Sequence, residues 1–165
     1  MVTIQPITPQ NAPTFKAARL RALQDTPSAF GSTYARESQF TDADWVARAN
    51  KWNGEKSILY MAMENETVIG IAGSHLDQDD PTQAHLISMW TAPTHREQGV
   101  GRLLVNEIVN WARLRNAVTL KLMMTSSNDS ATAFYRRLGF TLTGRTEPYP
   151  NDPALIEHEM ARPLS

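Results

Sequence analysis

The chain has 165 residues, of which 41% are hydrophobic and 20% charged, and its formal net charge is −1. These values are ordinary for one globular domain with a substantial core, so we expect a single domain over residues 1–165. They argue against a nucleic-acid partner, because no basic run is present, and against a membrane span, because no apolar stretch approaches the ~20 residues required. The absence of cysteine excludes disulfides, a thiol nucleophile and thiolate metal sites. The four histidines are scattered and the N-terminus lacks a signal-peptide plan, so we expect no metal and a cytoplasmic location.

Alternation and helical periodicity predict the elements of the chain. In order these are a strand at 2–5, a helix from Thr8 to a stop at 26–28, a partly helical segment at 29–37, a helix at 41–52, strands at 57–63, 67–76 and 84–91, a helix at 100–116, a strand at 119–125, a helix at 130–138, and strands at 140–147 and 155–160. Thr8 before a proline is typical of an N-cap, and Thr41 opens a sequence that resembles a capping box. The prolines of residues 148–153 predict a rigid loop. Strand–helix alternation after a meander indicates a mixed α/β (α+β) sheet.

A glycine-rich stretch joins the strand at 84–91 to the helix at 100–116. Gly99 and Gly101 fall where this helix begins. The first turn of a helix has backbone amides without a helical partner, and the helix dipole makes that end electropositive. Because glycine also permits close approach of a ligand to the backbone, the stretch is a candidate phosphate cradle, with the cations of Arg96 and Arg102 beside it. The Walker pattern is absent, and the dinucleotide pattern lacks its third glycine, whose place is held by Leu104.

What fits this stretch is the sequence Arg96-x-x-Gly99-x-Gly101, which resembles the pyrophosphate loop of the GNAT superfamily of acyl-CoA-dependent N-acetyltransferases. Further along, Asn128-x-x-Ala131-x-x-Phe134-Tyr135-x-x-x-Gly139-Phe140 resembles the second signature of that superfamily at every position. The two motifs follow one another in the family's order, and the resemblance covers about residues 57–160. It implies the GNAT fold, a mixed seven-stranded sheet splayed at strands 4/5 with about four flanking helices.

The resemblance also implies acetyl-CoA as cosubstrate, without a metal. Amides at the end of the fourth strand would bind the pantetheine arm and polarise the acetyl carbonyl, and amides of the glycine loop would hold the diphosphate. Asn128 would cap its helix or bond the pantetheine region, and the ring of Trp90 is expected in the core. The cofactor-binding residues implied in this way are Met89, Trp90, Thr91, Glu97, Gln98, Gly99, Val100, Gly101, Arg102, Asn128 and Tyr135.

Catalysis needs a proton for the leaving sulfur and a deprotonated amine. The resemblance implies Tyr135 as the general acid; otherwise it is a half-buried tyrosine with its hydroxyl on water. His85 on the fourth strand, acting through a water, and Glu37 are the candidate bases. The ordinary alternatives are that His85 is a plain strand residue and that Glu37 is a solvated glutamate. Some family members use no dedicated base. Relatives that acetylate ribosomal proteins carry a glutamate on the fifth strand that serves as the base. Met123 stands at that position here, so the resemblance supports neither a base on this strand nor that substrate.

We therefore expect direct transfer of an acetyl group to a primary amine of a small molecule or an amino-acid-like acceptor. The resemblance places the acceptor against the first two helices and the loop before the last strand. These regions offer Tyr34, Glu37, Trp45, Tyr149 and Asp152, and aromatic rings beside carboxylates suit a small cationic amine. Two alternatives stay open, a protein or peptide N-acetyltransferase and a non-catalytic acyl-CoA-binding module. Relatives are often dimers, so the resemblance also allows a homodimer.

Overall fold

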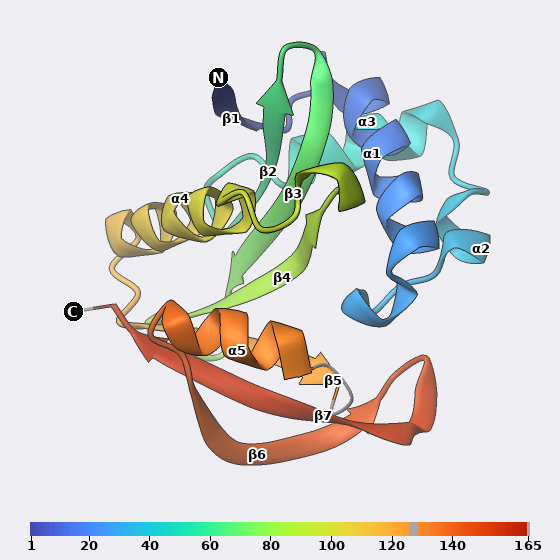
Figure 1. Cartoon of the computed structure of the whole chain (residues 1–165). Helices are drawn as coiled ribbons and strands as arrows, with labels where there is room; N and C mark the ends of the chain where they lie inside the picture. Colours follow the sequence, from blue (N-terminus) through green and yellow to red (C-terminus); the bar gives the residue numbers. More distant parts are fainter. Residues whose placement is uncertain (126–128, 165) are drawn as a thin grey trace.

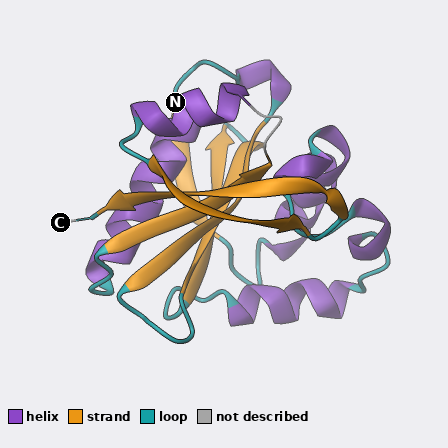
Figure 2. Cartoon of the chain, turned by 90° about the horizontal axis from the view of Figure 1, so that it is seen from below, coloured by secondary structure: helices purple, strands orange, loops and turns teal. Residues whose placement is uncertain are grey.

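The structure is a computed structural model that describes residues 1–125 and 129–164. A seven-stranded sheet carries helices on both faces (Figures 1 and 2). In chain order the elements are β1 (Val2–Pro6), α1 (Ala12–Asp25), the 3-10 turn η1 (Pro27–Ala29), α2 (Tyr34–Glu37), α3 (Asp42–Lys51), β2 (Ser57–Glu64), β3 (Thr67–Leu76), β4 (Gln83–Thr91), the 3-10 turn η2 (Pro93–His95), α4 (Val100–Leu114), β5 (Thr119–Thr125), α5 (Asp129–Arg137), β6 (Thr141–Tyr149) and β7 (Asp152–Pro163).

The sheet has the order β1-β2-β3-β4-β5-β7-β6. Its first four strands form an antiparallel meander, and β7 lies between β5 and β6, antiparallel to both. In the part of the chain that is described, β4 and β5 are parallel and pair at only three positions, which are Gln83–Thr119, Ala84–Leu120 and His85–Lys121. Beyond His85 the two strands separate, so the predicted mixed sheet with a splay between its fourth and fifth strands is confirmed.

Two apolar cores lie on the two faces of this sheet. Alternation along β2 sends Ile58 and Ala62 to the core under α4, where Leu104 and Ile108 are fully buried. The intervening Leu59 and its neighbours on the same face meet α1 and α3 in the second core. The period of two along strands and of 3.6 along helices therefore accounts for both layers.

The helix starts show where local sequence signals hold. The capping box of α3 is present, because the Asp44 amide donates to Thr41 Oγ1 at 3.1 Å and the Thr41 amide donates to Asp44 Oδ2 at 2.8 Å. The predicted N-cap at Thr8 is wrong. Its amide donates to Asn11 Oδ1 at 2.7 Å in a turn that precedes the helix, and α1 begins at Ala12.

The last two strands are longer than predicted. The expected loop at 148–153 shrinks to the connection Pro150–Asn151, because β6 runs to Tyr149 and β7 starts at Asp152. Pro148 is accommodated within β6 because β6 is an edge strand, where a missing backbone donor can face away from the sheet. The described chain also holds five α-helices, one more than expected, since the segment at 29–37 forms the four-residue α2.

Candidate active site

A bulge in β4 opens the sheet. Ile71 pairs with Trp90, but Gly73 pairs with Ile87, so β4 carries one extra residue against β3. Ser88 lies at this bulge with a φ of +57°, a left-handed conformation that is uncommon outside glycine. The bulge lies within the part of β4 that has left β5.

A cleft of about 790 Å³ lies where β4 and β5 diverge. Its walls are β4 from 86 to 91, the loop and first turn leading into α4, β5 from 122 to 125, and one side of α5. Residues of η1 close it from the direction of α1. The cleft thus lies between the two halves of the sheet and not on its surface.

The start of α4 presents backbone amides to this cleft. Gly99 is the N-cap with a φ of +86° and supplies no capping side chain, and no acidic residue occupies the first turn. The first intrahelical bond runs from the Leu103 amide to the Gly99 carbonyl at 3.1 Å, so the amides of Val100, Gly101 and Arg102 precede the helical hydrogen-bond ladder. Such a helix start favours an anion, and Arg96, Arg102 and Arg137 are among the residues that line the same cleft.

Gly101 brings α4 and α5 close together. A Cβ on this residue would lie 2.9 Å from Cζ of Phe134 and 3.0 Å from Cε of Met89. A side chain at this position would therefore displace the end of the Phe134 ring or the Met89 methyl group, so the close packing of the two helices favours glycine here.

Arg96 fixes the loop before α4. Its Nη2 donates to Asp25 Oδ2 at the end of α1, and its Nε donates to the Thr91 carbonyl at 3.1 Å. The indole N–H of Trp90 also donates to Asp25, at 2.9 Å, and is the largest of the contacts that hold the pKa of Asp25 below its usual value. The Trp90 ring is buried in the core, as the sequence predicted, while the residue's position on β4 keeps it in the cleft wall.

Tyr135 is the titratable hydroxyl that α5 places in the cleft wall. Its ring is buried and packs edge-to-face against Phe134 and Phe140, with centroids 5.1 and 5.6 Å away. Burial raises the pKa of the Tyr135 hydroxyl well above its ordinary value, so the group keeps its proton at neutral pH. A hydroxyl in this state can donate a proton or a hydrogen bond to a group in the cleft.

The cleft brings together nine of the eleven residues expected to bind the cofactor. These are Met89, Trp90, Thr91, Glu97, Gly99, Val100, Gly101, Arg102 and Tyr135. Gln98 is not among the lining residues; its side chain donates to the Thr94 carbonyl at 3.2 Å. Asn128 lies outside the described residues.

The two candidate bases lie elsewhere. His85 belongs to the closed part of the sheet, where its Nε2 is 2.8 Å from Asp77 Oδ1 and its ring stacks on His75 at 4.9 Å. Glu37 is 1% exposed and is bonded to the guanidinium groups of Arg19 and Arg48. Neither lines the cleft.

Glu37 is also a poor proton acceptor. Burial alone would raise its pKa, but the hydrogen bonds and charge of Arg19 and the charge of Arg48 outweigh burial and lower the pKa from 4.5 to about 2. The role of Glu37 as a base therefore finds no support in the structure.

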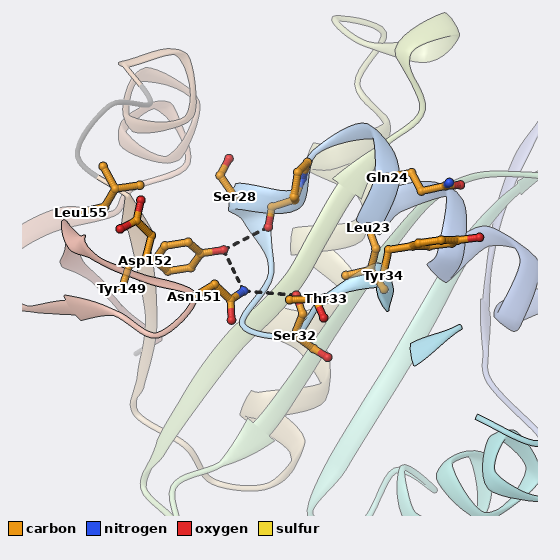
Figure 3. Close-up of a pocket in the computed structure, with 11 residues that line it drawn as sticks. Leu23, Gln24, Ser28, Ser32, Thr33, Tyr34, Tyr149, Asn151, Asp152 and Leu155 are labelled. Atoms are coloured by element: carbon orange, nitrogen blue, oxygen red, sulfur yellow. Dashed lines mark hydrogen bonds between the residues drawn. The ribbon is translucent and has the colours of Figure 1, made fainter. Parts of the chain in front are cut away.

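A second space, of about 630 Å³, adjoins the cleft on the side of α1 and α2 (Figure 3). The turn between β6 and β7 closes one side of it. The Tyr149 hydroxyl donates to the Phe30 carbonyl at 2.7 Å, and Asn151 Nδ2 donates to the carbonyls of Phe30 and Ser32 at 3.2 and 3.3 Å. Ser28 lines both this pocket and the cleft, so the two spaces meet at η1.

Three of the five expected acceptor-side residues line this pocket, namely Tyr34, Tyr149 and Asp152. The other two do not. Trp45 is 1% exposed and packs against Phe15 and Phe40 in the second core, and Glu37 is held in its ion pairs. Residues 32–34 of the segment that carries Glu37 line the pocket, but the Glu37 side chain is buried in the interior.

Comparison with known proteins decides the family. A model described as the acetyltransferase (GNAT) family matches residues 20–140. The chain belongs to the GNAT family. It is 30% identical over 117 residues to the [ribosomal protein bS18]-alanine N-acetyltransferase of Escherichia coli, a match that covers 68% of this chain and 75% of that protein. The chain spans less than two thirds of several other curated relatives, between 36% and 56% of their length.

Solved GNAT structures share the whole fold. The GNAT-family acetyltransferase of Streptococcus pneumoniae superposes with a TM-score of 0.83 over 100% of both chains at 20% identity. The yncA protein of Salmonella typhimurium, solved with acetyl-CoA, gives a TM-score of 0.79 over 100% of this chain and 95% of that one at 18% identity.

No group of three or more potential metal ligands gathers within the described ranges. No helix in the described part of the chain has the length and apolar character needed to cross a membrane. Sequence reasoning missed Ser88 and Arg19, which meet at the β4 bulge. No local signal marks them, because neither residue type is unusual in a strand or a helix.

Proposed function

We propose that this GNAT protein transfers an acetyl group from acetyl-CoA directly to a primary amine of a small acceptor. The observation that carries the proposal is the cleft between β4 and β5, whose walls hold the amide-rich start of α4, the separated edge of β4 and the Tyr135 hydroxyl. These are the groups that binding a diphosphate, polarising a thioester and protonating a thiolate require. A relative of the same fold solved with acetyl-CoA supports the choice of cosubstrate.

The chain's residues divide the chemistry in the proposed reaction. Amides of Val100, Gly101 and Arg102 hold the diphosphate, while amides of β4 between Met89 and Thr91 donate to the carbonyl oxygen as it gains charge. The amine nitrogen bonds to the carbonyl carbon, the carbon–sulfur bond breaks, and Tyr135 donates its proton toward the departing sulfur. Because neither His85 nor Glu37 lines the cleft, the amine loses its proton to water in the proposed reaction.

The acceptor is proposed to occupy the pocket of Figure 3, which meets the cleft at Ser28. Its described lining contains hydroxyls, two side-chain amides, two tyrosines and the carboxylate of Asp152, and neither lysine nor arginine. A lining of this kind suits a small amine that is cationic in solution, with Asp152 as the anion that attracts it.

Two measurements on the purified chain test the proposal. Acetyl-CoA at 100 times its Kd stabilises the folded state by about 2.7 kcal/mol, which raises the Tm by roughly 5–10 °C for a chain of this size. Thiol release from acetyl-CoA is then followed over a panel of polyamines, aminoglycosides, amino acids and peptides. We expect at least one small amine to release thiol, and Asp152→Asn to raise its KM with little change in that for acetyl-CoA. Stabilisation without thiol release from any amine would instead indicate an acyl-CoA-binding module.

A protein or peptide acceptor is the second candidate. The relationship to the bS18-alanine N-acetyltransferase favours it. Mass spectrometry of N-termini and lysines in cells with and without the gene separates the two, because only a protein acetyltransferase leaves enzyme-dependent acetylated proteins.

A further inference from the structure

A buried ion cluster joins the first three helices to one another. Glu37 of α2 accepts from Arg19 of α1 through both oxygens, Oε1 from Nε at 2.9 Å and Oε2 from Nη2 at 3.0 Å. Arg48 of α3 donates to Oε1 at 2.9 Å. Arg19 and Glu37 are only 3% and 1% exposed. Buried charges are costly unless they are paired with good geometry, so each group of this cluster depends on its partners.

The remaining donor of Arg19 leaves the helices and reaches the sheet. Its Nη1 donates to the Ser88 hydroxyl at 2.8 Å, and its guanidinium lies over the Phe30 ring at 4.6 Å. All three nitrogens of the guanidinium are therefore bonded, two to the carboxylate and one to β4. The planar fork of arginine makes this arrangement rigid.

Ser88, which accepts this hydrogen bond from Arg19, is the residue at the β4 bulge. Ser88 has the φ of +57° and lines the cleft immediately before Met89. A side-chain-bearing residue holds this conformation only where its surroundings enforce it. Arg19 itself does not line the cleft, so its effect on a ligand there passes through Ser88.

We infer that Arg19, oriented by Glu37, is a positioning residue: its bond to the Ser88 hydroxyl fixes the β4 bulge and so aims the following backbone amides at the thioester carbonyl. This inference rests on the proposed function. It assigns the ion cluster to the reaction and not to acceptor binding, although the cluster lies on the acceptor side of the sheet.

A pair of substitutions at Ser88 tests the inference. Ser88→Ala removes the hydroxyl but keeps a Cβ that disfavours positive φ, whereas Ser88→Gly removes the hydroxyl and also removes that strain. We expect Ser88→Ala to lower kcat about tenfold, equivalent to about 1.4 kcal/mol in the barrier, and Ser88→Gly to lower it less, by about threefold, because only the strain is relieved while the hydrogen bond is still lost. The assay uses acetyl-CoA and the amine of the panel that releases thiol fastest.

A spectroscopic signature separates positioning from mere stability. The infrared carbonyl band of bound acetyl-CoA labelled with carbon-13 at the carbonyl should lie below its solution frequency in the unaltered protein and in Ser88→Gly. In Ser88→Ala it should return toward the solution value, while the Kd for CoA, set by the start of α4, stays within about twofold. An unchanged band and kcat in Ser88→Ala, or equal losses in both variants, would overturn the inference.

Arg19→Met supplies the second half of the test. We expect it to move the carbonyl band as Ser88→Ala does, and to move it less in a Ser88→Gly background, because glycine no longer needs the hydrogen bond. Lys16→Met is the matched control, since it removes a cation of α1 whose partner Asp42 is exposed. If Arg19→Met fails to fold, the Ser88 pair decides alone. Failure of the unaltered protein to bind acetyl-CoA contradicts the proposed function, whereas a band shift that survives Ser88→Ala contradicts only this inference.

Discussion

The Tyr135 side chain is fixed in the wall of the cleft. Its ring packs between Phe134 and Phe140, and burial raises the pKa of its hydroxyl further above an ordinary value at which a tyrosine is already protonated at neutral pH. The position of this residue in a motif predicted its chemical role, and the structure adds the aromatic packing that fixes the ring. A ring held in this way can direct its hydroxyl at one atom of a ligand without losing rotamer freedom on each turnover.

Tyr135→Phe is expected to lower kcat roughly 100-fold, the lower end of the range for general acid catalysis, with the KM for acetyl-CoA changed by less than about threefold. Steady-state thiol release measures both constants. Tyr60→Phe is the matched control, because Tyr60 of β2 is half-buried against the first core and lies outside the cleft. Equal kcat in the two variants would remove Tyr135 from the mechanism.

Residues differ in how far the sequence could place them. The glycines of the α4 loop and Tyr135 could be predicted to share one site because their motifs are local, with all partners within a few positions, and the structure places them in one cleft. For Glu37 the sequence offered a base or a solvated glutamate. The buried ion pair could not be predicted, since its partner Arg19 lies 18 residues away and nothing local signals that they meet. Trp45 was assigned to the acceptor side for the same reason, although Phe15 buries it from a distant helix.

At the scale of elements, the approach of α4 to α5 depends on one missing side chain. Phe134 and Met89 occupy the space that a Cβ at Gly101 would need. Because α4 carries the amides of the proposed diphosphate site and α5 carries Tyr135, this contact sets the spacing between the two ends of the proposed reaction.

Gly101→Ala is therefore expected to weaken CoA binding by about tenfold or more, as the two helices separate or Phe134 leaves its place. Isothermal titration with CoA measures the change. Gly31→Ala provides the control, because Gly31 has a negative φ and no atom within 4 Å of its would-be Cβ. Unchanged CoA affinity in Gly101→Ala would show that the helices adjust without cost.

Element order and most strand bounds could be predicted, because hydrophobic alternation repeats over several residues. The ends were less predictable. The start of α1 moved from Thr8 to Ala12 because Asn11 competes for the same backbone groups, and β6 and β7 extend past their prolines because they pair with each other. The bulge at Ser88 was invisible, since it is set by the register against β3.

For the whole molecule, the ion cluster around Glu37 connects α1, α2, α3 and β4, so its titration acts on global stability. The folded-state pKa of Glu37 is lowered from 4.5 to about 2. The unfolded chain therefore takes up this proton more readily than the folded one. The stabilisation is fully present above pH 4.5 and is lost as pH falls toward 2, and the shift corresponds to about 3 kcal/mol.

Glu37→Gln should accordingly reduce the dependence of the free energy of unfolding on pH between pH 4.5 and 2. It should also lower the free energy of unfolding at pH 7 by about 3–5 kcal/mol, the usual effect of breaking a buried pair. Urea denaturation at pH 7, 4 and 3, followed by tryptophan fluorescence, gives both values. Asp42→Asn removes a carboxylate whose ion pair is exposed, and should leave the pH dependence as it was. A variant Glu37→Gln that kept the original slope would contradict the assigned pKa.

The place of β7 has a consequence for how the chain is made. β7 follows β6 in the chain but lies inside the sheet, bonded to β5 on one side and to β6 on the other. Until residues 152–163 have left the ribosome, β6 has no neighbour in the sheet and β5 lacks its antiparallel partner, so this half of the sheet cannot form. The meander of β1 to β4 needs no such delay, and we therefore expect the two halves of the sheet to form in two stages, with the half that bears the proposed acid second.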